Sequence, residues 1–333
     1  MFVRLRLHKS SVESSPTAVR GSYGCPMASS FSRRFGFLPA AAIALLWGTC
    51  TPGMAQEKPV MRWLLVHFPP STILVNDQPT NGTADEKLRL ITERWPEVKH
   101  EFINAKPGRV WRELAEPDAT ACADLAIITP EREKQLYMAA TSLHPPVAVI
   151  ARPAVLRTLA KNAAGEVLPG ALLDRNDLTG IVSPIRSYGA VIDSMLSGRS
   201  PKAHIETVLP WEGGRNILEM ISTHRADYTL EFERTFTYLA ASTPRLKDAG
   251  LQSAPIAGAK MNQVAIACPR NAWGYAAIKK IDAIITSLAG DPEFQQLNSS
   301  WISAKEQAYM KRASEAFYKA RAKPSAPDRY TPP

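Results

Sequence analysis

The sequence predicts an α/β fold built from two similar halves, and three observations support this. Short apolar runs typical of buried strands alternate with longer stretches in which apolar residues recur every three or four positions, as in amphipathic helices. The order β-α-β-α-β opens the first half, and the second half repeats the alternation, which favours parallel strands covered by helices. Finally, 45% of the 333 residues are hydrophobic and 21% are charged, which is typical of a chain with a packed core.

We expect residues 1–55 to be removed before the protein reaches its final form. An uncharged apolar run at 37–47 follows Arg33 and Arg34, and small residues follow it up to Ala55. Basic, apolar and small residues in that order are typical of a secretory signal peptide, cut between Ala55 and Gln56. The run is shorter than the roughly 20 residues that a membrane span needs.

Removing this segment changes the charge of the chain. The full chain carries a net charge of +9, and residues 1–55 contain six basic residues and one acidic residue, which leaves 34 basic and 30 acidic residues, a net charge of +4. So small a charge does not predict a nucleic-acid partner. Translation from either Met1 or Met27 remains open, since Met27 gives a signal peptide of ordinary length.

The first half of the remaining chain contains strands and helices in alternation. Thr83 and Glu86 have the spacing of a capping box, and apolar residues then follow at helical spacing, so we expect a helix over 83–95 that ends before Pro96. Pro107 is well placed to begin a second helix. The strands expected in this half are 62–67, 98–103, 124–128 and 146–151.

The second half repeats this pattern. The expected strands are 179–182, 205–209, 227–230 and 263–268. The expected helices are 188–196, 214–223, a strong helix from about Ala277 that stops at Gly290, a helix after Asp291-Pro292, and an amphipathic helix over about 304–322. The Pro-rich segment Lys323–Pro333 is expected to be a loose tail.

Two cysteines remain after removal of the signal peptide, Cys122 and Cys268. In an exported protein such a pair favours a disulfide, and two buried thiols are the alternative. The sequence has no CxxC or HExxH motif and no GxGxxG, Walker or GxSxG motif, so it predicts neither a metal site nor a cofactor.

Several segments resemble the bacterial type 2 periplasmic solute-binding proteins, in the branch that includes extracellular solute-binding protein family 3. They are the strand from Asp124 that ends in Thr129-Pro-Glu-Arg132, Ser142 with Pro145-Pro146, Gly180-Ile-Val with Ser187-Tyr-Gly189, and Arg225 to Glu231. Phe68-Pro69-Pro70 and Ala267-Cys-Pro-Arg270 are most similar to an uncharacterised proteobacterial branch. The resemblance covers about residues 60–305.

The resemblance implies a two-lobed fold, in which each lobe is a mostly parallel sheet flanked by helices and two hinge crossovers join the lobes. The crossovers would fall near 147–153 and 250–256. Lobe 1 would comprise 56–150 and 255–305, lobe 2 would comprise 151–254, and 306–333 would form a C-terminal helix and tail. Both cysteines would then lie in lobe 1.

The same resemblance singles out Arg132 as a ligand-binding residue, because the Arg of this motif grips a ligand carboxylate in related amino-acid binders. The interval from Asp124 to Arg132 is shorter here than in those binders. The alternative for Arg132 is a surface ion pair at a helix start. Thr129 is either a second contact or only the cap of the helix that begins at Pro130.

Most of the remaining candidate ligand contacts follow the expected strands of the second half, and Phe68 follows the first strand of the first half. Ser187 and Tyr188 precede a helix whose free N–H groups suit an anion, although Ser187 also suits simple capping. Arg186 adds a positive contact or is solvated. Glu231 would take a ligand amine. Phe68 and Trp211 would form apolar walls or belong to the core.

The sequence therefore predicts a monomeric periplasmic protein that captures a small carboxylate-bearing or amino-acid-like ligand by hinge closure. Its partner would be a membrane permease of the ABC type or a sensor domain. Two other functions remain open: a dehydratase-like enzyme on the same fold, with Glu231 as general acid or base, and an envelope signalling protein with an empty cleft.

Overall fold

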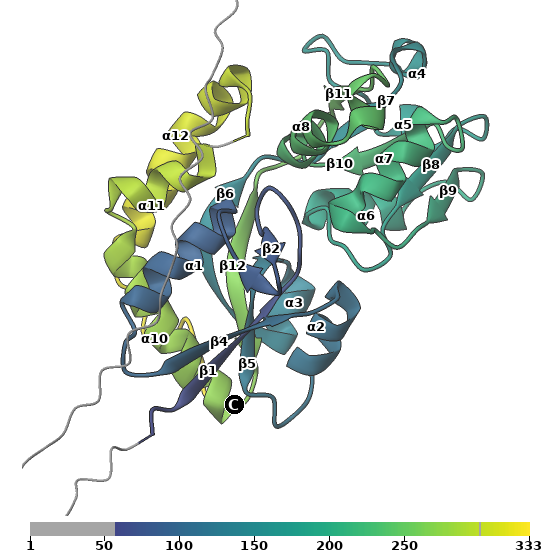
Figure 1. Cartoon of the computed structure of the whole chain (residues 1–333). Helices are drawn as coiled ribbons and strands as arrows, with labels where there is room; N and C mark the ends of the chain where they lie inside the picture. The colour runs from purple at the N-terminus through teal and green to yellow at the C-terminus, as the bar shows by residue number, and fades with distance from the viewer. Residues whose placement is uncertain (1–56, 300) are drawn as a thin grey trace, which may run out of the picture. The chain divides into compact units, whose positions relative to one another are not determined.

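The computed structural model describes residues 57–299 and 301–333, so the predicted signal peptide and its cleavage site lie outside the described residues. The described chain forms two five-stranded sheets and one short hairpin (Figure 1). Each sheet has helices on both faces, as the sequence predicts. No helix in the described part of the chain is long and apolar enough to cross a bilayer.

The first sheet has the strand order β4-β1-β5-β12-β6. Its strands are β1 (Val60–Leu65), β4 (Lys99–Asn104), β5 (Ala121–Ile127), β6 (Leu136–His144) and β12 (Asn262–Pro269). Four strands run in one direction and β12 runs against them. The hairpin consists of β2 (Leu74–Val75) and β3 (Gln78–Pro79).

Helices cover this sheet on both faces. They are α1 (Thr83–Glu93), α2 (Pro107–Leu114), α3 (Pro130–Gln135), α10 (Ala272–Leu288), α11 (Pro292–Gln296) and α12 (Ala304–Arg321), with a short 3₁₀ turn at Leu297–Ser299. Alternate residues of β1 explain the two layers: Trp63 packs with residues of α1, α10 and α12, whereas Leu64 packs with residues of α2.

The second sheet has the order β11-β7-β10-β8-β9, and only β7 runs against the others. Its strands are β7 (Ala148–Ala151), β8 (Thr179–Val182), β9 (His204–Thr207), β10 (Tyr228–Glu231) and β11 (Gln252–Pro255). Its helices are α4 (Pro153–Thr158), α5 (Gly170–Leu173), α6 (Ala190–Ser197), α7 (Arg215–Ser222), α8 (Glu233–Ser242) and α9 (Pro244–Lys247), with a 3₁₀ turn at Glu212–Gly214.

The chain passes twice between the two sheets, from β6 to β7 and from β11 to β12. The predicted crossovers coincide with β7 and β11, and both of these strands pair within the second sheet. The connecting segments between the sheets are residues 145–147 and 256–261. The predicted α/β fold with two mostly parallel sheets is confirmed.

Cys122 and Cys268 form a disulfide, with 4.4 Å between their Cα atoms. They lie on β5 and β12, which are neighbouring antiparallel strands of the first sheet. The predicted bond is therefore confirmed.

The predicted capping box at Thr83 and Glu86 is wrong by one residue. The N-cap is Gly82, and Asp85 accepts hydrogen bonds from the backbone N–H of Gly82 at 2.9 Å and of Ile73 at 2.8 Å. The loop before the helix supplies further acceptors, because the Ser71 carbonyl accepts from the N–H of Ala84 at 2.8 Å. These contacts leave Glu86 free to pair with Arg89 at 2.8 Å.

The C-terminal segment, predicted as a loose tail, makes specific contacts with the first sheet and α10. Tyr330 is buried, and its hydroxyl donates to Asp282 Oδ1 at 3.1 Å. The Tyr137 hydroxyl donates to the carbonyl of Thr331 at 2.7 Å. Arg329 pairs with Glu133 at 3.1 Å. A buried aromatic ring at the end of the tail holds it against the fold.

Candidate functional site

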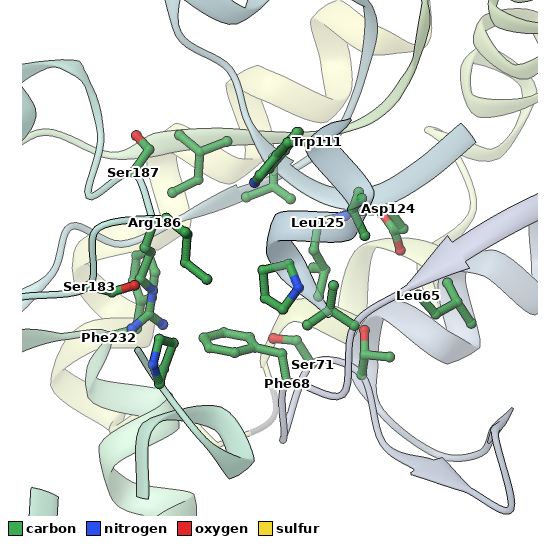
Figure 2. Close-up of a pocket in the computed structure, with 18 of the residues that line it drawn as sticks. Leu65, Phe68, Ser71, Trp111, Asp124, Leu125, Ser183, Arg186, Ser187 and Phe232 are labelled. Atoms are coloured by element: carbon green, nitrogen blue, oxygen red, sulfur yellow. Dashed lines mark hydrogen bonds between the residues drawn. The ribbon is translucent and has the colours of Figure 1, made fainter. Parts of the chain in front are cut away.

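A cavity of about 140 Å³ is lined by residues from both sheets and their loops. Figure 2 shows Ser183, Arg186 and Phe232 on one side and Leu65, Asp124 and Leu125 on the other, with Phe68 between them. Other lining residues are Val66, Ser71, Thr72, Pro107, Val110, Trp111, Ile127, Arg132, His144, Ile185, Ser187, Pro210 and Val264. The walls are therefore mostly apolar, with a few polar and charged groups, as in small-molecule binding sites.

Arg132 reaches the cavity from the first turn of α3. Thr129 caps this helix, since its Oγ1 accepts from the Arg132 N–H at 3.3 Å. The Arg132 guanidinium donates to the Ile127 carbonyl at 2.9 Å and lies 4.2 Å from the centre of the Trp111 ring. Cation–π attraction to the indole face holds the guanidinium against Trp111.

The Arg132 guanidinium has no carboxylate within ion-pair distance among residues 57–299 and 301–333. Burial lowers its pKa. An arginine nevertheless remains charged at neutral pH, because its ordinary pKa lies far above 7. The cavity thus contains a partly buried cation whose charge is not compensated by a protein anion at close range.

Arg186 carries a second guanidinium, and this one is paired. Its Nη1 donates to Glu231 Oε2 at 2.6 Å and its Nη2 to Oε1 at 2.8 Å, which is the bidentate geometry of a strong ion pair. Glu231 Oε1 also accepts from the Phe232 N–H at 2.7 Å. Burial raises the pKa of Glu231, and the charge of Arg186 opposes that rise.

The paired Arg186 guanidinium also lies against aromatic rings. It is 4.6 Å from the centre of the Phe68 ring and 5.4 Å from that of Phe232. Phe68 follows β1 of the first sheet, whereas Arg186 follows β8 of the second. This contact therefore joins the two sides of the cavity.

Asp124 is a lining residue that the sequence indicated only as part of a motif. Its Oδ1 accepts from the Leu125 N–H at 2.6 Å, and burial raises its pKa to about 7. The buried Lys87 interacts electrostatically with it, and burial lowers the pKa of Lys87 to about 7. An acidic residue within a run of apolar strand residues was the available signal for this site.

The structure places four predicted residues at the cavity: Arg132, Phe68, Arg186 and Ser187. The Ser187 hydroxyl donates to Asp193 Oδ2 at 2.5 Å and its oxygen accepts from the Gly189 N–H at 3.1 Å. Asp193 Oδ1 accepts from the Tyr188 N–H at 2.8 Å. The backbone N–H groups before α6 that we expected to meet an anion are thus bonded to Ser187 and Asp193.

The other four predicted residues do not line this cavity. Thr129 caps α3 and Glu231 is bonded to Arg186. Tyr188 is buried, and its hydroxyl accepts from the Ser183 N–H at 2.7 Å. Trp211 is 57% exposed and lines an adjoining hollow of about 630 Å³, which shares five lining residues with the cavity: Val66, Phe68, Pro107, Ile185 and Pro210. The ring of Trp211 lies 4.8 Å from the Arg215 guanidinium.

No protein-family model matches the chain, and no curated protein matches it by sequence. Solved structures do resemble it. An arginine-specific periplasmic binding protein from Salmonella typhimurium has a TM-score of 0.55 at 12% identity, covering 74% of this chain and 100% of that one.

Two further structures extend the comparison. The periplasmic VFT2 domain of BvgS from Bordetella pertussis has a TM-score of 0.55 at 17% identity, covering 73% of this chain and 94% of that one. A reconstructed ancestral amino-acid-binding protein, described as a precursor of cyclohexadienyl dehydratase, has a TM-score of 0.53 at 15% identity, covering 73% and 96%. The chain therefore has the two-lobed fold of the type 2 periplasmic binding proteins, as its sequence motifs indicate.

Proposed function

We propose that this protein is an exported solute-binding protein that captures a small carboxylate-bearing ligand in the cavity between its two lobes. The observation that carries this proposal is Arg132, whose guanidinium lines the cavity without a carboxylate partner among the described residues. A guanidinium can give a carboxylate two parallel charge-assisted hydrogen bonds. The apolar walls around it suit the remainder of a small organic ligand.

Hinge closure would be the mechanism. The lobe built on the first sheet would supply Arg132, and the lobe built on the second sheet, from β7 to β11, would supply Arg186 and Ser187. A ligand that contacts both lobes binds the closed arrangement more tightly than the open one, and this difference in affinity shifts the population toward closure. The closed form would then be read by an ABC-type permease or by a sensor domain in the periplasm.

Arg132→Gln tests the role of Arg132. We expect the affinity for any carboxylate ligand to fall by roughly 10- to 100-fold, because a hydrogen bond to a charged group contributes about 1.5–3 kcal/mol. Isothermal titration calorimetry measures this loss. Arg157→Gln is the control, because Arg157 is an exposed arginine of α4 that lies outside the cavity.

Arg132→Gln removes the hydrogen bond to the Ile127 carbonyl and the contact with Trp111 but no ion pair among the described residues, so we expect a modest fall in the thermal midpoint of the unliganded protein with the fold retained. A carboxylate ligand that binds Arg132→Gln as tightly as the original chain would contradict the proposed contact. If carboxylates and amino acids at millimolar concentration leave the thermal midpoint of the original chain unchanged, a ligand-free signalling role in the envelope is favoured instead.

An enzyme on the same fold is the alternative, and Asp124 is the observation that favours it. A carboxyl group that lines a cavity and has a pKa raised to about 7 is suited to proton transfer near neutral pH. Glu231, the residue we expect from the sequence in that role, is held in its ion pair with Arg186. Chromatography that detects conversion of a bound ligand into a product would support the hypothesis that the protein is an enzyme.

A further inference from the structure

We infer that the cavity takes a monocarboxylate with an apolar body about the size of one ring, and that it discriminates against the same molecule carrying an α-ammonium group. This inference rests on the proposed function, because it assigns the ligand class of the same site. It departs from the amino-acid ligands named for several structures of this fold. Three features of the cavity support it.

The first feature is the charge balance of the lining residues and of Glu231, which lies behind Arg186. Arg132 is available to an anion, whereas both oxygens of Glu231 are engaged by Arg186 and one of them also by the Phe232 N–H. An ammonium group would therefore find Glu231 already neutralised and would lie near two guanidinium groups. Removing an ammonium from water without an anionic partner is costly, and the neighbouring like charges add to that cost.

The second feature is the state of the aromatic rings. An aromatic face can bind an ammonium group through a cation–π interaction. Here the Trp111 ring already faces the Arg132 guanidinium at 4.2 Å, and the Phe68 ring faces that of Arg186 at 4.6 Å. Phe232 lies within 5.4 Å of the same Arg186 group. The rings thus already make cation–π contacts with the two arginines, so they would stabilise a ligand ammonium only weakly.

The third feature is size. The cavity measures about 140 Å³. An apolar protein cavity of about 150 Å³ accommodates one benzene molecule. Leu125, Ile127 and Ile185 contribute aliphatic surface to the walls. A ligand with one six-membered ring and a carboxylate directed at Arg132 would fit the volume and the chemistry.

Asp124 is the carboxyl that lines the cavity in the described part of the chain. Its Oδ1 already accepts from the Leu125 N–H, and its nearby cation is the buried Lys87. The Leu125 N–H and the buried Lys87 thus already compensate the Asp124 carboxylate, which makes it a weak partner for a ligand ammonium.

Three probes with one common body test the inference. Phenylacetate carries the carboxylate alone, L-phenylglycine adds an α-ammonium to it, and phenylacetamide replaces the carboxylate with a neutral amide. We expect calorimetry at pH 7.5 on residues 56–333 to show that phenylacetate binds at least about tenfold more tightly than either of the others, which corresponds to about 1.4 kcal/mol. Arg132→Gln should lower the affinity for phenylacetate to that for phenylacetamide.

A second variant tests the role of the ion pair. Arg186→Met frees the Glu231 carboxylate, so the preference for phenylacetate over L-phenylglycine should fall at least about fivefold, or reverse. Arg157→Met is the matched control and should leave the preference unchanged. If Arg186→Met does not fold, the comparison of the three probes on the original chain still decides the inference.

The outcomes separate this inference from the proposed function. If L-phenylglycine binds as tightly as phenylacetate, the inference is overturned while a carboxylate-binding function stands. If none of the three probes binds, the inference is also overturned. The thermal-shift screen of other carboxylates and amino acids then decides the proposed function independently.

Discussion

The Arg132 guanidinium lines the cavity because of its position at the start of a short helix. Thr129 and Pro130 begin α3, and the helix ends at Gln135, so Arg132 lies one turn beyond the end of β5. From there its side chain reaches back to the Ile127 carbonyl and onto Trp111. Contacts with a carbonyl and an aromatic ring position the guanidinium without neutralising its charge.

Asp124 should make the stability of the protein depend on pH. Its pKa is about 7 in the folded protein and 3.8 ordinarily, so the folded state holds this proton to higher pH than the unfolded state. The free energy of unfolding should therefore fall as pH rises from about 4 to 7, by on the order of 1 kcal/mol per pH unit from this residue. Lys87 acts in the opposite sense above pH 7, because its pKa is lowered to about 7.

Asp124→Asn should remove the fall between pH 4 and 7. Urea unfolding at pH 5 and pH 7 measures it: the free energy of unfolding of the variant, relative to the original chain, should increase from pH 5 to pH 7. The exposed Asp118→Asn should follow the original chain at both pH values. An equal difference between Asp124→Asn and the original chain at the two pH values would show that Asp124 titrates as an ordinary carboxyl.

At the scale of elements, the C-terminal segment after α12 contributes to stability. Tyr330 is 9% exposed and packs in the core cluster that also contains Tyr137 and Tyr318. Its hydroxyl donates to Asp282, which also pairs with Arg321 at 2.9 Å. The tail thus contributes both a buried ring to the apolar core and a hydrogen bond to Asp282.

Tyr330→Ala should lower the free energy of unfolding by about 2–4 kcal/mol, since it removes a buried ring and its hydrogen bonds. Tyr309→Ala is the matched control, because Tyr309 is 58% exposed on α12, and we expect its effect to be within about 0.5 kcal/mol. Urea unfolding compares the two variants. Equal, small effects of both substitutions would mean that the tail is loosely attached.

Elements with a clear local pattern could be predicted from the sequence, and those without one could not. The strand at 179–182 was predicted with its observed bounds, and the helix beginning at Thr83 with its observed start. The strand β6, in contrast, was not predicted. Its residues are almost all buried and include Thr141 and Ser142, so neither alternation nor an uninterrupted apolar run marks it. Helix α8 follows β10 so closely that no turn signal separates them.

The candidate site was predictable only in part for a related reason. The sequence motifs indicate four residues of the cavity, namely Arg132, Phe68, Arg186 and Ser187. The pairing of Arg186 with Glu231 could not be read from the sequence, because it joins residues 45 positions apart on different elements. Whether a charged residue is available to a ligand depends on its tertiary partners, and the sequence does not specify these.

At the scale of the whole molecule, the disulfide should affect stability without affecting ligand binding. The replacement of Cys122 and Cys268 by Ala should lower the free energy of unfolding by about 2–5 kcal/mol, because the bond closes a long loop. The affinity for the ligand should stay within about twofold, since both cysteines lie in the first sheet. A reductant should destabilise the original chain similarly and leave the variant unchanged. Weaker ligand binding by the variant would contradict the assignment of the bond to one lobe.

The position of that disulfide has a consequence for the continuity of the chain. The cysteines are 146 positions apart, and the whole second sheet with its helices lies between them. A protease that cuts once in a loop between strands of the second sheet therefore produces two fragments that remain joined by the disulfide. Separation of the fragments would require reduction as well as unfolding, so in an oxidising compartment a single cut there leaves one molecule.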